Sequence, residues 1–269
     1  MTKVKNIMNN PIVLDKETSI GEVASKILKE RISRILISDD GNISEIVSEK
    51  DICHFLLKKQ NGSINKIPIS EISKTIISIN PDEGLKECSK KMISNNVGSL
   101  GVGTEKINGI VTKTDIVKNI QTNLKEKSAV EIMSNDYLWE FSNESINKIF
   151  KKMIDYNVSR LILKEENEIS SGIITIRDLL KLGFSDFNKN SIQNMELDTD
   201  LLFERFNSEE IKGKEISSKE IISVGMMEDL EKVCSLLLTK GIDGVGVLND
   251  NNIIWGVLTK TDIVKAFID

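Results

Sequence analysis

Four short motifs in the sequence place a hydroxyl side chain three residues before an aspartate. The pairs are Ser48 and Asp51, Thr112 and Asp115, Thr175 and Asp178, and Thr259 and Asp262. Each pair follows an apolar run typical of a strand and precedes apolar residues at helical spacing. Free N–H groups and a hydroxyl at a helix start can bind phosphate or sugar oxygens, and the carboxylate can accept hydrogen bonds from ribose hydroxyls. The four motifs are therefore candidate binding sites for a ligand with phosphate or sugar oxygens.

The same spacing also fits a structural role. In a capping box, the acid three residues after a serine or threonine satisfies the free backbone N–H at the helix start. Capping boxes favour glutamate or glutamine at that position, whereas all four motifs carry aspartate. Copies of one ancestral unit do not count as independent support. Both interpretations remain open for each aspartate.

Basic residues accompany the motifs. Lys113 and Lys260 directly follow their threonines, where each could contact a phosphate or lie at a solvated helix end. Arg34 and Arg160 stand next to apolar residues of predicted strands, where a long cation requires an anionic partner. A polyphosphate or a surface carboxylate would serve equally.

The elements that position these motifs repeat four times. Four amphipathic helices are predicted, and the first residues of their apolar stripes are Ile20, Leu85, Ile146 and Leu230. Two short strand-like runs follow each helix, and the interval from its first apolar residue to the motif aspartate is 30 to 32 residues in every copy. A further helical pattern follows each aspartate. Each copy therefore reads as strand, helix, strand, strand, helix, an α/β unit too small to bury both faces of its sheet alone.

The copies fall into two alternating classes. The first and third share an apolar–Ser–Arg–apolar sequence around Arg34 and Arg160, and the second and fourth share the hexapeptide T-K-T-D-I-V. This pattern predicts two similar modules, residues 1–126 and 127–269. The predicted repeats cover about 1–62, 63–126, 127–184 and 214–269, and an insertion over about 185–213 is predicted to form a packed extra helix, with a lid or a partner-docking element as the alternative.

Composition narrows the classes of function. The 269 residues carry a net charge of −5. The protein therefore has no overall positive field that would attract the phosphate backbone of a nucleic acid. No apolar stretch is long enough for a membrane span and no signal peptide is apparent, so we expect a cytoplasmic protein without membrane contact. Three widely spaced cysteines predict reduced, structural thiols and no metal site.

Four strand-helix-strand-strand-helix units, three closing in G-h-h-[ST]-x-x-D (h apolar), resemble CBS domains arranged as two tandem pairs, called Bateman modules. The first copy departs from the pattern, with Glu45 in place of glycine and Ser48 in place of threonine. The resemblance implies a regulatory module that binds adenine nucleotides (AMP, ADP or ATP) or other adenosyl ligands in clefts between repeats. It also implies a disk-like assembly of the two pairs, formed within one chain or between two chains.

On this interpretation the chain is a sensor that signals to a separate effector protein, and an adenine nucleotide is its regulatory ligand, with no catalytic cofactor. The alternative is a scaffold without sensing, whose clefts are degenerate. An enzyme is not supported, because the sequence shows no nucleophile–base pair, metal constellation or complete phosphate loop.

Overall fold

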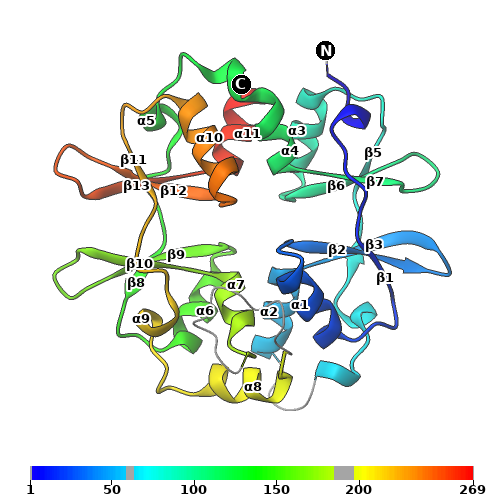
Figure 1. Cartoon of the computed structure of the whole chain (residues 1–269), viewed down its shortest axis with the longest axis horizontal. Helices are drawn as coiled ribbons and strands as arrows, with labels where there is room; N and C mark the ends of the chain where they lie inside the picture. Colours follow the sequence, from blue (N-terminus) through cyan, green and yellow to red (C-terminus); the bar gives the residue numbers. More distant parts are fainter. Residues whose placement is uncertain (1, 59–63, 185–196, 269) are drawn as a thin grey trace. The chain divides into compact units, whose positions relative to one another are not determined.

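A computed structural model describes residues 2–58, 64–184 and 197–268, and it contains four copies of one strand-helix-strand-strand-helix repeat (Figure 1). This element order confirms the predicted α/β fold. The first repeat contains β1 (Val13–Asp15), α1 (Ile20–Lys29), β2 (Arg34–Asp39), β3 (Asn42–Ser48) and α2 (Glu49–Lys58). The second contains β5 (Ser78–Ile79), α3 (Leu85–Ser94), β6 (Ser99–Val102), β7 (Gly109–Thr112) and α4 (Lys113–Ile120).

The third and fourth repeats keep the same order. The third contains β8 (Trp139–Phe141), α6 (Ile146–Asp155), β9 (Arg160–Lys164), β10 (Ser170–Thr175) and α7 (Ile176–Lys181). The fourth contains β11 (Ser223–Gly225), α10 (Leu230–Lys240), β12 (Gly244–Leu248), β13 (Ile254–Thr259) and α11 (Lys260–Ile268). Short elements outside the repeats include β4 (Lys74–Thr75), α5 (Ala129–Ile132), α8 (Thr199–Asn207) and α9 (Gly213–Ile216).

Each repeat forms one small sheet with the same pairing. Its first strand runs parallel to its second strand, and its second and third strands form an antiparallel hairpin. A parallel pair requires a crossover, and the first helix of the repeat supplies it. The hairpin then delivers the end of the third strand to the start of the second helix, where the serine or threonine of each motif lies.

The first helix of each repeat contains its predicted apolar stripe and begins at the first residue of that stripe. Each of these helices is followed by a residue in the left-handed conformation, which turns the chain toward the next strand. These residues are Arg31, Asn96, Asn157 and Gly241, with φ values of 55°, 51°, 54° and 63°. The reversal therefore recurs at the same place in all four copies, although only the fourth copy uses glycine there.

The repeats gather into two compact units. Unit 1 comprises residues 1–11, 76–137 and 221–269, and unit 2 comprises residues 12–75 and 138–220. Unit 1 thus holds the second and fourth repeats, and unit 2 holds the first and third. The units follow the two sequence classes, whereas the modules over 1–126 and 127–269 stay a prediction.

Each unit has its own hydrophobic core beneath four packed helices. In unit 2, α1, α2, α6 and α7 lie together, and their buried faces form one cluster with the strands (Figure 1). In unit 1, α4 and α11 pack against each other and against α3 and α10, over a second cluster. Two repeats thereby bury apolar faces that one small sheet with two helices would leave in water.

The insertion contributes a helix to unit 2, as predicted. Helix α8 packs on α6 and α7, and its Leu202 and Phe206 are 0% and 2% exposed. Residues 185–196 of the predicted insertion lie outside the described residues.

Candidate functional site

All four motifs stand at the same junction between a strand and a helix. Ser48, Thr112, Thr175 and Thr259 end their strands, and the following residue begins the helix. The aspartate is therefore the third helical residue, with its carboxylate directed back over the helix start. This placement follows from the local sequence, because apolar strand residues stop where the motif begins.

The aspartates cap their helices in every copy. One carboxylate oxygen, Oδ2, accepts from the backbone N–H of the serine or threonine at 2.8 to 2.9 Å in all four motifs. The same oxygen also accepts a hydrogen bond from the side-chain hydroxyl of that residue, at an oxygen–oxygen distance of 2.5 to 2.7 Å. The capping interpretation is thus confirmed, and contact of these side chains with a ligand stays a prediction. Capping leaves the second oxygen, Oδ1, as the atom that a ligand could reach, and we call it the outer oxygen.

The four outer oxygens differ in their partners. In Asp51 the outer oxygen accepts from the ammonium of Lys74, and in Asp115 it accepts from the side-chain amide of Asn9 at 2.8 Å. In Asp178 the partner is Lys181, one helical turn further on, at 2.9 Å. For Asp262, no partner of the outer oxygen occurs among the described residues.

The two arginines lie beside motifs of unit 2. In the antiparallel ladders, Arg34 stands opposite Ser48 and Arg160 stands opposite Thr175. Both side chains are half-buried and have partners within the protein. The corresponding residues of unit 1, opposite Thr112 and Thr259, are Ser99 and Gly244. Only the motifs of unit 2 therefore carry an arginine at this strand position.

The lysines of unit 1 connect its two repeats. Lys113 donates to the hydroxyl of Thr261, and Lys260 donates to the hydroxyl of Thr114, both at 2.9 Å. Lys260 also forms an ion pair with Asp243 at 2.9 Å, although its own side chain is only 7% exposed. The structure thus places Lys260 inside the unit, in contrast to the solvated helix end considered from the sequence. Phosphate contact by either lysine stays a prediction.

Cations in unit 2 make equivalent cross-repeat contacts. Lys50 donates to the backbone and side-chain oxygens of Asn157, at 2.9 and 3.0 Å. Arg177 reaches Glu49, the backbone oxygen of Ile32 and the hydroxyl of Ser33. These contacts join the motif region of one repeat to the helix–strand turn of the other.

The electrostatics around Lys50 indicate a basic cluster at the Asp51 motif. Burial lowers the pKa of the Lys50 ammonium, and the negative charge of Asp51 partly raises it again. The nearby positive charges of Lys74 and Arg160 lower this pKa further. Arg160 of the third repeat therefore lies close to the motif of the first. An anion placed near these cations would reduce their mutual repulsion.

The motif glycines make room for a neighbouring chain segment. A Cβ on Gly109 would lie 2.6 Å from the sulfur of Met8, and a Cβ on Gly256 would lie 2.8 Å from the backbone oxygen of Ser134. In the first copy Glu45 replaces glycine, and its carboxylate accepts the hydroxyl of Ser73 at 2.6 Å. The departure of the first copy from the pattern is thus compensated by a hydrogen bond.

Sequence reasoning missed Lys74 and Asn9, which hold two of the outer oxygens. Both lie in segments that precede a repeat, and Lys74 contributes to the edge strand β4. Neither residue belongs to a recurring motif. Their proximity to the aspartates depends on how those segments fold back onto the sheets.

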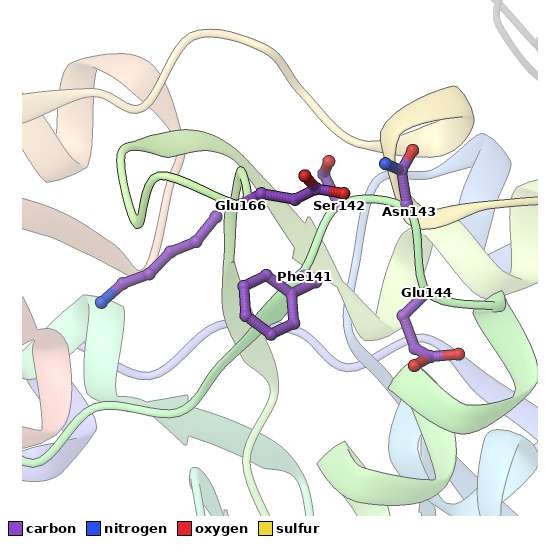
Figure 2. A pocket seen from close by; sticks show the side chains of 6 residues that line it. Phe141, Ser142, Asn143, Glu144 and Glu166 are labelled. Atoms are coloured by element: carbon purple, nitrogen blue, oxygen red, sulfur yellow. The ribbon is translucent and has the colours of Figure 1, made fainter.

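A surface hollow of about 320 Å³ lies elsewhere in unit 2. Figure 2 shows side chains that line it, and its residues are Phe141, Ser142, Asn143, Glu144, Lys164 and Glu166. None of the predicted site residues belongs to this set. Phe141 is 39% exposed and stacks edge to face on Trp139 at 5.4 Å. Glu140, which lies between these two residues in the sequence, is buried instead at 9% exposed.

Within residues 2–58, 64–184 and 197–268, no three histidine, cysteine, aspartate or glutamate side chains group as metal ligands. No helix in that part of the chain is both long and apolar enough to span a membrane.

Comparison with solved structures reveals the same fold elsewhere. Protein MJ1225 of Methanocaldococcus jannaschii superimposes with a TM-score of 0.85 at 19% identity, over 99% of this chain and 100% of that one. In sequence, the two proteins are 28% identical over 194 residues, covering 66% of this chain and 69% of MJ1225. A conserved protein of Pyrococcus horikoshii gives a TM-score of 0.64 at 15% identity, over 98% and 99% of the two chains.

Some of the similar proteins are enzymes, and each match covers only part of the enzyme. The homoserine O-acetyltransferase of Methanococcus vannielii is 26% identical over 145 residues, which is 52% of this chain and 27% of the enzyme. Because the match omits most of the enzyme, it carries no acetyltransferase activity to this chain. The CBS domain model, in contrast, matches residues 4–58, 69–122, 129–184 and 214–269. Four matches over most of the chain, on four copies of one fold, show that the protein belongs to the CBS domain family.

Proposed function

We propose that this protein is a non-catalytic regulator that binds an adenine nucleotide, AMP, ADP or ATP, or a related adenosyl ligand, at its [ST]-x-x-D motifs. The observation that carries the proposal is the fourfold recurrence of a carboxylate whose outer oxygen is not used by its own cap. A vicinal diol donates hydrogen bonds to such an oxygen, and bonds to a charged acceptor are stronger than neutral ones. The adenosyl class itself comes from the family resemblance.

Charge around the motifs supports a phosphate on the ligand. The free N–H groups of a helix start favour an anion. In unit 2, Arg34 and Arg160 stand across the ladder from Ser48 and Thr175, and Lys50 and Lys74 add positive charge near Asp51. An arginine presents several donors in one plane, which suits phosphate oxygens.

The regulatory step is a population shift. A ligand changes the conformation of the protein only if it binds one arrangement more tightly than another. Contacts such as Lys50 to Asn157 and Arg177 to Glu49 join two repeats within a unit. A phosphate that competes for Lys50 would therefore alter a contact between repeats, and an effector protein would sense the change.

Isothermal titration with AMP, ADP, ATP and S-adenosylmethionine tests the proposal. We expect at least one ligand to bind with a dissociation constant on the order of micromolar, about −8 kcal/mol. A matched pair of variants separates binding from capping. Asp178→Glu keeps a capping carboxylate but moves it toward the ligand, so we expect binding at that motif to be lost while thermal stability is retained.

Glu131→Ala provides the control. Glu131 caps α5 through Ser128 in the same geometry but lies outside the four motifs. Its removal should leave ligand affinity unchanged. If all four ligands remain silent at millimolar concentration, the sensor proposal fails.

A scaffold without ligand binding is the second candidate. It is favoured by the outer oxygens of Asp51, Asp115 and Asp178, which already accept hydrogen bonds from side chains of the protein. If every motif were closed in this way, only the protein surface would carry function. The same titration distinguishes the two candidates.

A further inference from the structure

In every repeat, a separate short segment of the chain pairs through its backbone with the third strand, at the same position of that strand. The backbone of Asn9 exchanges hydrogen bonds with Ile110 at 2.8 and 3.0 Å, and Ser134 does so with Val257 at 2.9 Å in both directions. Ile110 and Val257 each lie two residues before the motif threonine. In unit 2 the equivalent pairs are Lys74 with Ile46 and Ser218 with Ile173. We call Asn9, Lys74, Ser134 and Ser218 the bridge residues.

Two bridge residues have side chains that reach the motif aspartate. The amide nitrogen of Asn9 donates to the outer oxygen of Asp115 at 2.8 Å. The ammonium of Lys74 forms an ion pair with the outer oxygen of Asp51, and the two side chains are 68% and 12% exposed. In these two copies, the oxygen that a ligand hydroxyl would use is already an acceptor.

The other two bridge residues are serines, whose hydroxyl is too short to span the same gap. Ser134 instead donates to the backbone oxygen of Asp136 at 3.4 Å. Because the backbone pairing of Ser134 and Asn9 is the same, the difference between the two copies comes from the side chain alone. Asp262 retains its capping bonds to Thr259, and its outer oxygen has no partner in the part of the chain that the structure describes.

Asp178, in the third copy, represents an intermediate case. Its bridge residue is Ser218, and its outer oxygen is held instead by Lys181 of the same helix. Lys181 is 34% exposed, so its ammonium can move into water when another donor arrives. The closure of this copy therefore does not depend on the bridge position.

We propose that at the Asp51, Asp115 and Asp262 motifs the bridge residue decides whether the aspartate accepts a ligand hydroxyl, so that Asp262 is the first acceptor and Lys74 and Asn9 keep the Asp51 and Asp115 motifs closed. This inference rests on the proposed function and assigns its first occupied motif. A ligand at Asp115 must displace a charge-assisted hydrogen bond from Asn9, whereas a ligand at Asp262 displaces no partner of the outer oxygen among the described residues. Loss of such a bond typically reduces affinity about ten- to a hundredfold.

Exchanging the bridge residues tests the inference, with AMP as the probe. Titration calorimetry gives affinity, and native mass spectrometry gives the number of bound molecules. Ser134→Asn places an amide beside Asp262, so the tightest site should weaken at least tenfold. Asn9→Ser frees the outer oxygen of Asp115, so the number of AMP molecules bound at saturation should rise by one, or the affinity at Asp115 should increase at least tenfold. Both substitutions preserve the backbone pairing, and thermal melting verifies the fold.

Asn10→Ser is the matched control. Asn10 is exposed and follows the bridge residue directly, so its replacement should change neither affinity nor stoichiometry. Asp262→Ala should remove the tightest site, whereas Asp115→Ala should leave it intact.

The possible failures can be told apart. If the wild-type protein binds AMP but Ser134→Asn leaves the tightest site unchanged, or Asp115→Ala removes that site, the inference is overturned and the proposed function stands. If AMP, ADP, ATP and S-adenosylmethionine all fail to bind the wild type, the proposed function fails and the inference falls with it.

Discussion

Lys260 and Asp243 form an ion pair in which the lysine is buried and the aspartate is exposed. The side chains are 7% and 59% exposed, and the distance from Nζ to Oδ1 is 2.9 Å. The ammonium also donates to Thr114 of the other repeat in unit 1. A buried cation is costly unless it is paired, so this contact links the stability of the fourth repeat to the second.

Replacing Asp243 with asparagine should destabilise the protein, because it leaves the Lys260 ammonium with less charge compensation. We expect a loss of about 1 to 2 kcal/mol in the free energy of unfolding, since the exposed aspartate is partly screened by water. Urea denaturation measures it. Asp243→Asn combined with Lys260→Met should recover part of the loss, because the methionine removes the buried charge. If the double variant has a lower free energy of unfolding than Asp243→Asn alone, this account is contradicted.

Arg177→Lys should destabilise unit 2. The guanidinium of Arg177 bonds to Glu49, Ile32 and Ser33 of the other repeat, and a single ammonium cannot serve three acceptors in different directions. We expect a loss of about 2 kcal/mol, measured by guanidinium denaturation. Lys181→Arg, on the same helix, is the control and should change stability little. Equal stability of the two variants would show that the cross-repeat contacts of Arg177 contribute nothing.

The motif glycines should tolerate alanine to different degrees. At Gly256 the new methyl group would lie 2.8 Å from a backbone oxygen, which cannot move without displacing the segment at Ser134. At Gly109 the nearest atom is the sulfur of a flexible Met8 side chain. Thermal melting should therefore give a larger destabilisation for Gly256→Ala, of about 1 to 3 kcal/mol, than for Gly109→Ala. Gly225→Ala, which meets nothing within 4 Å, should be close to neutral. The reverse order would refute the packing role of these glycines.

Stability should fall in alkaline solution through the cysteines. Burial raises the pKa of Cys88 and of Cys234 to about 12, whereas an unfolded thiol titrates near 8.5. Between these values the unfolded chain releases protons that the folded chain retains, so each thiol lowers stability as pH rises through that window. At pH values below about 8.5, the pKa of a thiol in the unfolded chain, the stabilising contribution of each buried thiol is fully present. The slope for one thiol approaches about 1.4 kcal/mol per pH unit.

Urea denaturation at several pH values between 8 and 10.5 measures this slope. Cys88→Ala and Cys234→Ala should each reduce it, whatever their effect on stability at neutral pH. A slope that is unchanged in both variants would show that other groups cause the alkaline loss.

The local sequence determined most of the repeat architecture. The apolar spacing from Ile20, Leu85, Ile146 and Leu230 predicted the first helix of each repeat and its buried face, because residues that face the core of a helix recur every three or four positions. The [ST]-x-x-D spacing predicted a strand–helix junction, and the capping box that forms there is a contact between residues three apart. The apolar stripe and the capping motif both depend only on residues close together in the sequence, so they could be predicted without the tertiary structure.

Tertiary structure decided which charges meet. Lys74 approaches Asp51 because a segment beyond the first repeat adds an edge strand to its sheet, and Asn9 reaches Asp115 across more than a hundred residues of sequence. The burial of Lys260 likewise depends on packing against the second repeat. Contacts of this kind follow from how the repeats bury their apolar faces together. The four aspartates therefore look equivalent in the sequence, and only the folded chain distinguishes Asp262, whose outer oxygen has no partner among the described residues, from the other three.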